Sequence, residues 1–420
     1  MAAMQPVSDP PSTAQCPPGV DAGTRCLSGQ DSAGAYYLIA VPTGWNGDLV
    51  LHDHGGPFLG APQAKRVEED LTRWSVFPRL GYAWAASSYR QGGVAVTAAA
   101  EDTERLRLIV QQVLGKPRHV WLHGQSWGAG VAAKGAELFT VGRPYDGVLL
   151  TAGVLGGGPR SYDFRLDLRV VYQYLCHNHP RADEPAYPLN IGLPEHSTLT
   201  AEALSQRINA CLGIDKPARE RSAEQQRKLQ TLLDVVRIPE RSVVAHMNWA
   251  TFHFREIVVK RTGGASPFGN LGVVYHGSAD DKALNAGVER VAAEPAAVAA
   301  FTRDAGLSGR IPVPVLTVHA IHDPTAFVEL QDTFGHIMEA AGHGDDLVQA
   351  YTDDREHSYL SDPTYAALIG ALSAWVVGGD RPTPTGLARD CERARARVSG
   401  TCRFRPDYTP PALSSRTPAR

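Results

Sequence analysis

A single serine flanked by glycines is the first feature of this sequence that could carry out chemistry. Ser126 lies in the pentapeptide GQSWG at residues 124–128, after an apolar run at residues 120–122 and before a run of small residues at 128–133. The two runs predict a buried strand and a helix, so Ser126 is expected at a sharp strand-to-helix turn. Such a turn lifts the serine hydroxyl clear of the strand, where it can attack a carbonyl group.

A serine hydroxyl is a poor nucleophile at neutral pH and needs a base that takes its proton. His357 is the favoured base, because it lies just past the short apolar run at residues 347–351, which predicts the last strand. Histidine suits this task since its ordinary pKa lies close to neutral pH. The rival bases are His336, on a predicted helix, and His343, in a Gly-rich turn.

An acidic residue is expected to hold the second ring nitrogen of the histidine and to stabilise the imidazolium ion. Asp323 is the candidate, because it is the one carboxylate at the end of the apolar strand predicted over residues 311–320. The alternative for Asp323 is a turn-forming role before Pro324. The acidic side chains of residues 353–356 are interpreted as a solvated loop.

Hydrolysis of an acyl group also needs N–H donors for the negative oxygen that develops in the transition state. One predicted donor is the backbone N–H of Trp127, the residue after the nucleophile. The other is expected in the HGGP segment at residues 54–57. Pro57 has no N–H, so Gly56 is the choice and Phe58 the reserve.

These motifs together resemble the α/β-hydrolase superfamily, in which the triad follows the chain order Ser126, Asp323, His357. The resemblance implies a mostly parallel sheet flanked by helices, and catalysis through an acyl-enzyme on the serine. The HGGP and GQSWG segments are also similar to those of proline iminopeptidases. The present sequence departs from that pattern at Phe58, where a glycine is usual, and at SYRQG (residues 88–92), where DxRG is usual.

Alternating apolar and helical patterns support the same fold class. Strands are predicted over residues 35–42, 47–52, 81–89 and 145–155. A helix is predicted over residues 96–114. Its apolar side chains are expected to face the core and its charged side chains to face solvent, namely Asp102, Glu104, Arg105 and Arg107.

Between residues 156 and 310, longer helical patterns replace the alternation of strands and helices. Helices are predicted over residues 162–175, 200–212, 223–237 and 240–261, with Thr200 and Ser222 as N-caps. The resemblance implies a helical lid that walls the substrate pocket, and the alternative is a separate domain. The predicted divisions are an irregular N-terminal extension (1–34), the first part of the catalytic core (35–155), the lid (156–310), the second part of the core (311–380) and a C-terminal extension (381–420).

Composition narrows the range of partners. The 420 residues carry a net charge of −3, which gives no electrostatic footprint for nucleic acid. No apolar segment approaches the ~20 residues of a membrane-spanning helix. No cofactor is expected, because neither a P-loop nor a GxGxxG fingerprint is present. The pairs His52-x-His54 and His177-x-His179 lack a third ligand at suitable spacing, so a metal site is disfavoured.

Six cysteines suggest an oxidising compartment, secreted or periplasmic. They allow 15 pairings, and pairing of sequence neighbours is a guess from short loop closure. The alternative is six reduced thiols in a cytosolic enzyme. The first residues show no basic segment followed by an apolar one, so no secretory signal is predicted there. The cysteines lie outside the predicted core strands, at Cys16, Cys26, Cys176, Cys211, Cys391 and Cys402.

The function predicted from the sequence is a serine carboxylesterase acting on a small-molecule or polymeric ester. A proline-iminopeptidase-like aminopeptidase is the first alternative, and it would need carboxylates for the substrate's ammonium group. Glu240, Asp280 and Asp281 are candidates for that role. A catalytically idle hydrolase-fold binding protein is the second alternative. The acyl group, the alcohol and the oligomeric state stay open.

Overall fold

Nine strands form one continuous sheet in the computed structural model, which describes residues 10–420. The strand order is β1-β2-β3-β5-β4-β6-β7-β8-β9. The pairs β1/β2, β2/β3 and β3/β5 are antiparallel, and all pairs from β5 to β9 are parallel. The strands are β1 (Ser12–Ala14), β2 (Arg25–Gln30), β3 (Tyr36–Val41), β4 (Leu49–Asp53), β5 (Ala83–Ser87), β6 (Val120–Gln125), β7 (Gly147–Thr151), β8 (Val315–Ala320) and β9 (Leu347–Thr352).

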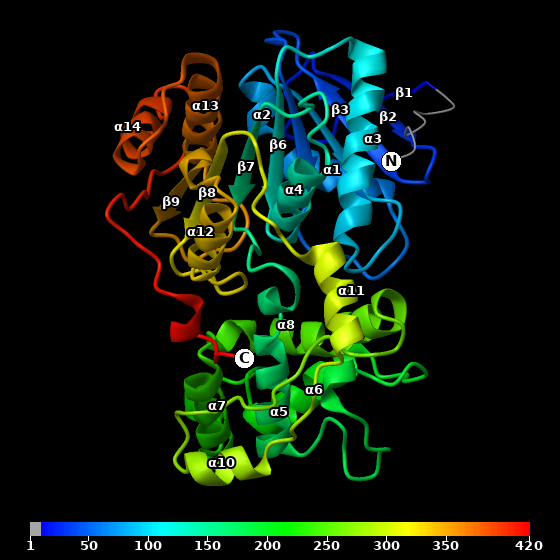
Figure 1. The fold of residues 1–420 in the computed structure, drawn as a ribbon, viewed down its shortest axis with the longest axis vertical. Coiled ribbons are helices and arrows are strands. Elements are labelled where there is room, and N and C mark those ends of the chain that lie inside the picture. Colours follow the sequence, from blue (N-terminus) through cyan, green and yellow to red (C-terminus); the bar gives the residue numbers. More distant parts are fainter. Residues whose placement is uncertain (1–9) are drawn as a thin grey trace. The chain divides into compact units, whose positions relative to one another are not determined.

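Helices cover both faces of this sheet, as the uninterrupted apolar strands predict (Figure 1). Successive side chains of a strand point to opposite faces, so Leu49 and Leu51 of β4 join one apolar core and Val50 joins the other. Helices α3 (Val96–Leu114), α4 (Trp127–Leu138) and α12 (Leu330–Ala340) contribute to the first core. The second core includes residues of α1 (Ala64–Arg73), α2 (Val76–Arg79), α13 (Asp362–Gly378) and α14 (Pro384–Ala394).

The chain divides into two compact units. The first contains the sheet and comprises the described residues up to Gly156 together with Leu307–Pro410. The second comprises Gly157–Gly306 and Pro411–Arg420, and it is helical. It is therefore inserted between β7 and β8, and the last ten residues of the chain fold with it.

The N-terminal region is not irregular, contrary to the prediction. β1 and β2 extend the sheet, and Cys26 lies on β2, inside the sheet. These strands escaped prediction because β1 is exposed and β2 is only partly buried, so neither needs an apolar pattern. Residues 1–9, where the sequence predicts no secretory signal, lie outside the described residues.

The solvent-facing side of α3 was also predicted wrongly, because Asp102, Glu104 and Arg105 are buried. Asp102 accepts hydrogen bonds from the Arg90 backbone (2.7 Å) and guanidinium (2.8 Å), and it also pairs with Arg105. Arg105 reaches Asp31 at 2.7 Å. The charges are buried because their partners lie on other segments, which a helical pattern alone does not reveal.

The helices of the second unit match most of the predicted spans. Thr200 and Ser222 are N-caps, as predicted, and Ser222 forms a full capping box with Gln225. The region predicted as one helix over 240–261 alternates between 3-10, α and π turns. The α-helices of the unit are α5 (Phe164–Cys176), α6 (Ala201–Leu212), α7 (Ala223–Val236), α8 (Val243–Asn248), α9 (Phe254–Glu256), α10 (Asp281–Gly287) and α11 (Pro295–Ala305).

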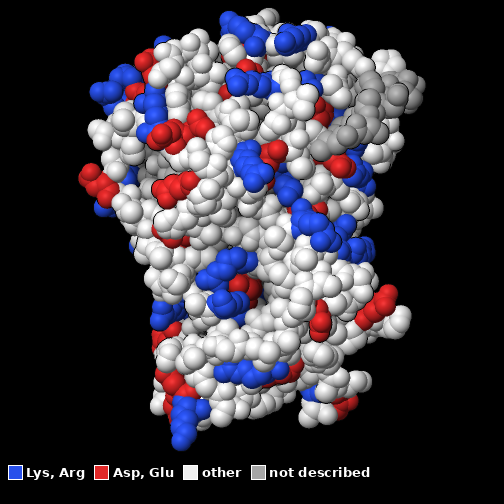
Figure 2. All heavy atoms as spheres, in the orientation of Figure 1, with Lys and Arg blue, Asp and Glu red and all other residues white. Residues whose placement is uncertain are grey.

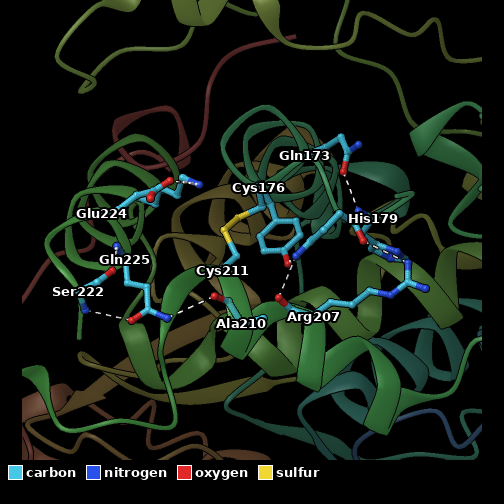
Figure 3. The surroundings of a disulfide bond; sticks show 12 residues. Gln173, Cys176, His179, Arg207, Ala210, Cys211, Ser222, Glu224 and Gln225 are labelled. Carbon is cyan, nitrogen blue, oxygen red and sulfur yellow. Dashed lines mark hydrogen bonds and ion pairs between the residues drawn. A yellow bond between two sulfur atoms is a disulfide. The ribbon is translucent and has the colours of Figure 1, made fainter. Parts of the chain in front are cut away.

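Three disulfides join the six cysteines in neighbouring pairs, Cys16–Cys26, Cys176–Cys211 and Cys391–Cys402. Figure 3 shows the second of them, which ties the end of α5 to the end of α6. Beside it, the Gln225 side chain donates to the Ala210 carbonyl at 3.2 Å, so the N-terminus of α7 is held to the same place. The pairing guessed from short loop closure is confirmed.

The segment after α14 covers the open edge of β9. The Asp353 N–H donates to the Arg403 carbonyl at 2.8 Å, and the Arg405 N–H donates to the Tyr351 carbonyl at 2.8 Å. An uncovered edge strand would present unpaired backbone groups to another chain. The Cys391–Cys402 disulfide closes the loop that leads into this segment.

Figure 2 shows one face of the molecule coloured by charge. Lys and Arg side chains are interspersed with Asp and Glu on the face drawn in Figure 2, without a continuous patch of one sign. Among residues 10–420, no helix has the length and apolar character needed to cross a membrane.

Candidate active site

Ser126 stands at the turn between β6 and α4 with a left-handed backbone, at φ 57° and ψ −120°. This conformation is strained for a non-glycine residue and persists only where its surroundings hold it. Here the Ser126 N–H donates to the Thr151 carbonyl (2.9 Å), and the Ser126 carbonyl accepts from Val154 N–H (3.0 Å). Bonds to the neighbouring β7 segment on both sides therefore fix the turn.

The glycines that flank Ser126 are required by backbone approach. A Cβ atom on Gly128 would lie 2.1 Å from the Asp53 carbonyl oxygen and 2.4 Å from that of His54. A Cβ atom on Gly124 would lie 2.3 Å from the Gly128 carbonyl oxygen. The GQSWG motif thus lets β6, α4 and the segment after β4 meet without side chains between them.

Gly128→Ala is expected to destabilise the fold by at least about 3 kcal/mol, because the contacts it creates are with rigid backbone atoms. The matched control is Gly370→Ala on α13, where a Cβ atom would meet nothing within 4 Å. That substitution should stabilise the protein by about 1 kcal/mol. Urea unfolding of the two variants checks the pair. Equal stabilities of the two variants would contradict the close approach at Gly128.

The structure brings Ser126, Asp323 and His357 together beyond the carboxyl ends of the parallel strands β6, β8 and β9, with β7 between β6 and β8. His357 Nε2 lies 2.8 Å from Ser126 Oγ, and His357 Nδ1 lies 2.7 Å from Asp323 Oδ2. Asp323 Oδ1 accepts from the backbone N–H groups of Thr325 (2.7 Å) and Ala326 (3.0 Å). Asp323 is therefore a fully engaged hydrogen-bond acceptor, and its side chain is buried.

The other candidates lie elsewhere. His336 is exposed on α12 and contacts Asp332 and Glu339, and His343 contacts Asp346 in its own turn. Of the acidic residues after β9, Asp353 pairs with His322 at 3.2 Å and Arg405 at 3.4 Å. None of these contacts reaches Ser126.

Sequence reasoning missed a second histidine behind Asp323. The buried His319 places Nε2 2.9 Å from the Ala326 carbonyl oxygen and 3.6 Å from Asp323 Oδ2. Gln331 Nε2 lies 3.1 Å from His319 Nδ1, which assigns the Nε2–H tautomer to the ring. Burial lowers the His319 pKa, so the ring is neutral and holds the 323–326 turn through a hydrogen bond. The available signal was its place at the end of the Asp323 strand.

The predicted oxyanion donors lie on the two segments next to the nucleophile. Trp127 is the first residue of α4. Gly56 has φ +68° and is exposed, in the loop after β4. A Cβ atom on Gly55 would lie 2.9 Å from Ser126 Cβ, so the first glycine of HGGP packs directly against the nucleophile's residue.

The histidine pairs noted in the sequence have structural partners. His52 Nδ1 lies 2.9 Å from His123 Nδ1, in a buried setting of aromatic rings that includes Trp74. Burial lowers the pKa of both rings, so the pair is neutral, with one ring donating to the other. His179 is buried and lies 3.0 Å from Thr251 Oγ1. Across residues 10–420, no group of three or more His, Cys, Asp or Glu side chains could hold a metal.

Asp53, at the end of β4, is a buried acid that the sequence did not single out. It accepts hydrogen bonds from Thr103 and from the Tyr89 hydroxyl at 3.3 Å. Burial raises the pKa of Asp53 to about 8, although these hydrogen bonds oppose the shift. The carboxyl group is therefore protonated at neutral pH.

The raised pKa predicts a pH dependence of stability. In the folded state Asp53 keeps its proton up to about pH 8, whereas an ordinary Asp loses it near pH 4. The folded state thus binds more protons between these values, so unfolding free energy falls as pH rises through this window. Asp53→Asn removes this dependence. In urea unfolding, the free energy of unfolding of Asp53→Asn relative to that of the wild type should rise from pH 5 to pH 8. If the difference between the two free energies stayed constant over this range, the protonated state of Asp53 would be contradicted.

Comparison with known proteins gives distant structural matches only. No protein-family model and no curated protein sequence matches the chain. Feruloyl esterase B from Aspergillus oryzae matches at 11% identity and a TM-score of 0.45, over 89% of this chain and 88% of that chain. The rice cell wall degrading esterase LipA from Xanthomonas oryzae matches at 12% identity and a TM-score of 0.37, over 79% and 83%. At these values the matches assign no substrate.

The class of protein follows from the chain's own architecture. The mostly parallel sheet, the helices on both faces and the strained serine between β6 and α4 are those of the α/β-hydrolase fold, as predicted. The order of Ser126, Asp323 and His357 after β6, β8 and β9 is also the order of that fold.

Proposed function

We propose that this protein is a serine hydrolase that cleaves carboxylic esters through an acyl-enzyme on Ser126. The hydrogen-bonded chain from Ser126 Oγ through His357 to Asp323 Oδ2, at 2.8 and 2.7 Å, carries the proposal. A nucleophile, a base and an orienting acid within hydrogen-bond reach form the arrangement that acyl transfer needs. No cofactor takes part in this chemistry.

In the first half-reaction, His357 Nε2 takes the Ser126 proton as Oγ bonds to the ester carbonyl carbon. The carbonyl oxygen becomes negative, and the Trp127 N–H and the Gly56 N–H are the proposed donors to it. The tetrahedral intermediate then collapses, and His357 gives its proton to the departing alcohol. Water repeats the sequence on the acyl-enzyme, which releases the carboxylic acid and restores the Ser126 hydroxyl.

Asp323 has two roles in this cycle. Its Oδ2 fixes the tautomer in which Nδ1 carries hydrogen and Nε2 faces Ser126, and its charge stabilises the imidazolium ion. Because Oδ1 is held by two backbone N–H groups, the carboxylate cannot rotate away from the ring without breaking both bonds.

The aminopeptidase alternative gains no support from its candidate carboxylates. Glu240 pairs with Arg221, Asp280 caps α10, and Asp281 accepts from the Ser278 hydroxyl at 2.6 Å. Each of these groups has a structural role in the second unit. No observation therefore favours one of them as the anchor of a peptide ammonium group.

Paired hydrolysis of p-nitrophenyl butyrate and prolyl p-nitroanilide by the wild type tests the proposed function. We expect rapid ester cleavage and no anilide cleavage above background. Comparable rates on both substrates would move the protein to the aminopeptidase class. A fluorophosphonate probe that fails to label Ser126 would instead support an idle binding protein.

Three disulfides also support a location outside the reducing cytosol, which we propose to be the extracellular space or the periplasm.

A further inference from the structure

A pocket of about 310 Å³ lies in the first unit, beside the proposed nucleophile. Its walls come from the loop after β4, the start of α1 and the turn after β5, together with Trp127. The segments next to Ser126 therefore also line the pocket, because Trp127 follows the serine and Gly55, which precedes the Pro57 wall, packs against it. Neither Ser126 nor His357 lines the pocket, so the pocket adjoins the nucleophile through these two segments.

Four of the seventeen residues that line the pocket carry aromatic rings, and of these four only Phe58 is exposed. The His54 ring stacks on Tyr89 at 4.3 Å between centroids, and Tyr89 meets Trp127 edge to face at 5.9 Å. The centre of the Phe58 ring lies 6.4 Å from that of His54, and Phe58 is 57% exposed. The Arg66 guanidinium lies 4.8 Å from the centre of the Phe58 ring. Phe58 is thus an apolar ring that its own neighbours leave half uncovered.

The walls are held in place before any ligand arrives. The Tyr89 hydroxyl donates to Asp53, and the Gly93 N–H donates to the Phe58 carbonyl at 2.6 Å. A Cβ atom on Gly92 would lie 2.1 Å from the Gly60 carbonyl oxygen, so the two loops that face each other touch through backbone. A preformed pocket orders little on binding, so its own conformational entropy cost is small.

The two basic side chains at the pocket have acidic partners on α1, of which Glu69 lines the pocket and Asp70 does not. Lys65 contacts Glu69 at 3.4 Å, and Arg66 contacts Asp70 at 3.1 Å and donates to the Gly55 carbonyl at 3.0 Å. A charged ligand group would have to compete with these partners. The aromatic surface therefore sets the preference, and it favours an uncharged ring.

We propose that this pocket binds an aryl group of the ester substrate, with Phe58 as the residue that sets the preference for a ring over an aliphatic group. This inference rests on the proposed function for its link to turnover, while binding in the pocket is independent of it. Edge-to-face and stacked contacts favour an aryl ring over an apolar group of similar size by up to about tenfold.

Hydrolysis of two matched pairs of esters tests the preference. One pair varies the acyl group, methyl 3-phenylpropanoate against methyl 3-cyclohexylpropanoate. The other varies the alcohol, 2-phenylethyl acetate against 2-cyclohexylethyl acetate. We expect the phenyl member of at least one pair to have a kcat/KM five- to tenfold higher. Phe58→Leu should bring that ratio close to one, and Phe58→Tyr should restore it. The control Val141→Ala changes a residue that is 95% exposed and outside the pocket, and should leave the ratio unchanged.

A binding measurement separates this inference from the esterase proposal. Dissociation constants of 3-phenylpropanamide and 3-cyclohexylpropanamide are determined by ligand-observed NMR with Ser126→Ala and with Ser126→Ala/Phe58→Leu. Tighter binding of the phenyl amide that depends on Phe58, without ester turnover by the wild type, would uphold the pocket and reject the esterase. Ester turnover without a Phe58-dependent phenyl preference in rate or binding would overturn the pocket assignment.

Discussion

Ser126→Ala is expected to lower kcat for ester hydrolysis by a factor of about 10⁴ to 10⁶, because it removes the hydroxyl that is hydrogen-bonded to His357 Nε2. The residual rate would come from the oxyanion donors and from substrate binding alone. Steady-state kinetics with p-nitrophenyl butyrate measures the effect, and mass spectrometry of the acylated protein identifies the modified residue.

The matched control for this prediction is Ser373→Ala on α13. Ser373 is only partly buried and lies beside Asp48 and Arg118, which precede β4 and β6, whereas Ser126 follows β6, so activity and unfolding midpoint should both stay within error of the wild type. If Ser126→Ala retained more than a tenth of the wild-type kcat, the acyl-enzyme on Ser126 would be rejected.

Asp323→Asn has the second largest expected effect, a fall in kcat of about 10³ to 10⁴ with little change in KM. The amide can donate a hydrogen bond to His357 Nδ1 and so favours the tautomer whose Nε2 carries hydrogen. That nitrogen then cannot accept the Ser126 proton. Stability is expected to change much less than activity, because Asn keeps an oxygen for the Thr325 and Ala326 N–H groups.

Asp353→Asn serves as the control, since Asp353 lies four residues before His357 but is half exposed and pairs with His322. Its kcat should match that of the wild type. Equal losses in the two variants would mean that the loop needs negative charge in general, and Asp323 would lose its assigned role.

The fold could be predicted where burial imposes a pattern on the sequence. Central strands such as β4 and β6 are covered on both faces. Their residues are therefore mostly apolar, and each strand appears in the sequence as an apolar run. The helix caps at Thr200 and Ser222 were predictable because capping chemistry is local. β1 and β2 were missed because β1 is exposed and β2 is only partly buried, so neither needs such a pattern.

The residues of the candidate site could be placed together because parallel strands end at one edge of a sheet. Ser126, Asp323 and His357 were each expected after a strand, and β6, β8 and β9 lie in one run of parallel strands with only β7 between β6 and β8. Their catalytic role stays a prediction until the variants are measured. His319 and the buried charges of α3 depend on which segments pack beside them, and no pattern within a single segment contains that information.

Two of the three disulfides stand at opposite margins of the sheet. Cys16–Cys26 fastens β1 to β2 at one edge, and Cys391–Cys402 fastens the tail that shields β9 at the other, whereas β6, which leads to Ser126, contains no cysteine. The redox state of these two disulfides should therefore affect the long-term stability of the protein more than its catalytic rate. In a thiol-reducing buffer we expect the initial rate to persist while the exposed margins self-associate. Activity would then decline over hours, and faster in concentrated than in dilute samples.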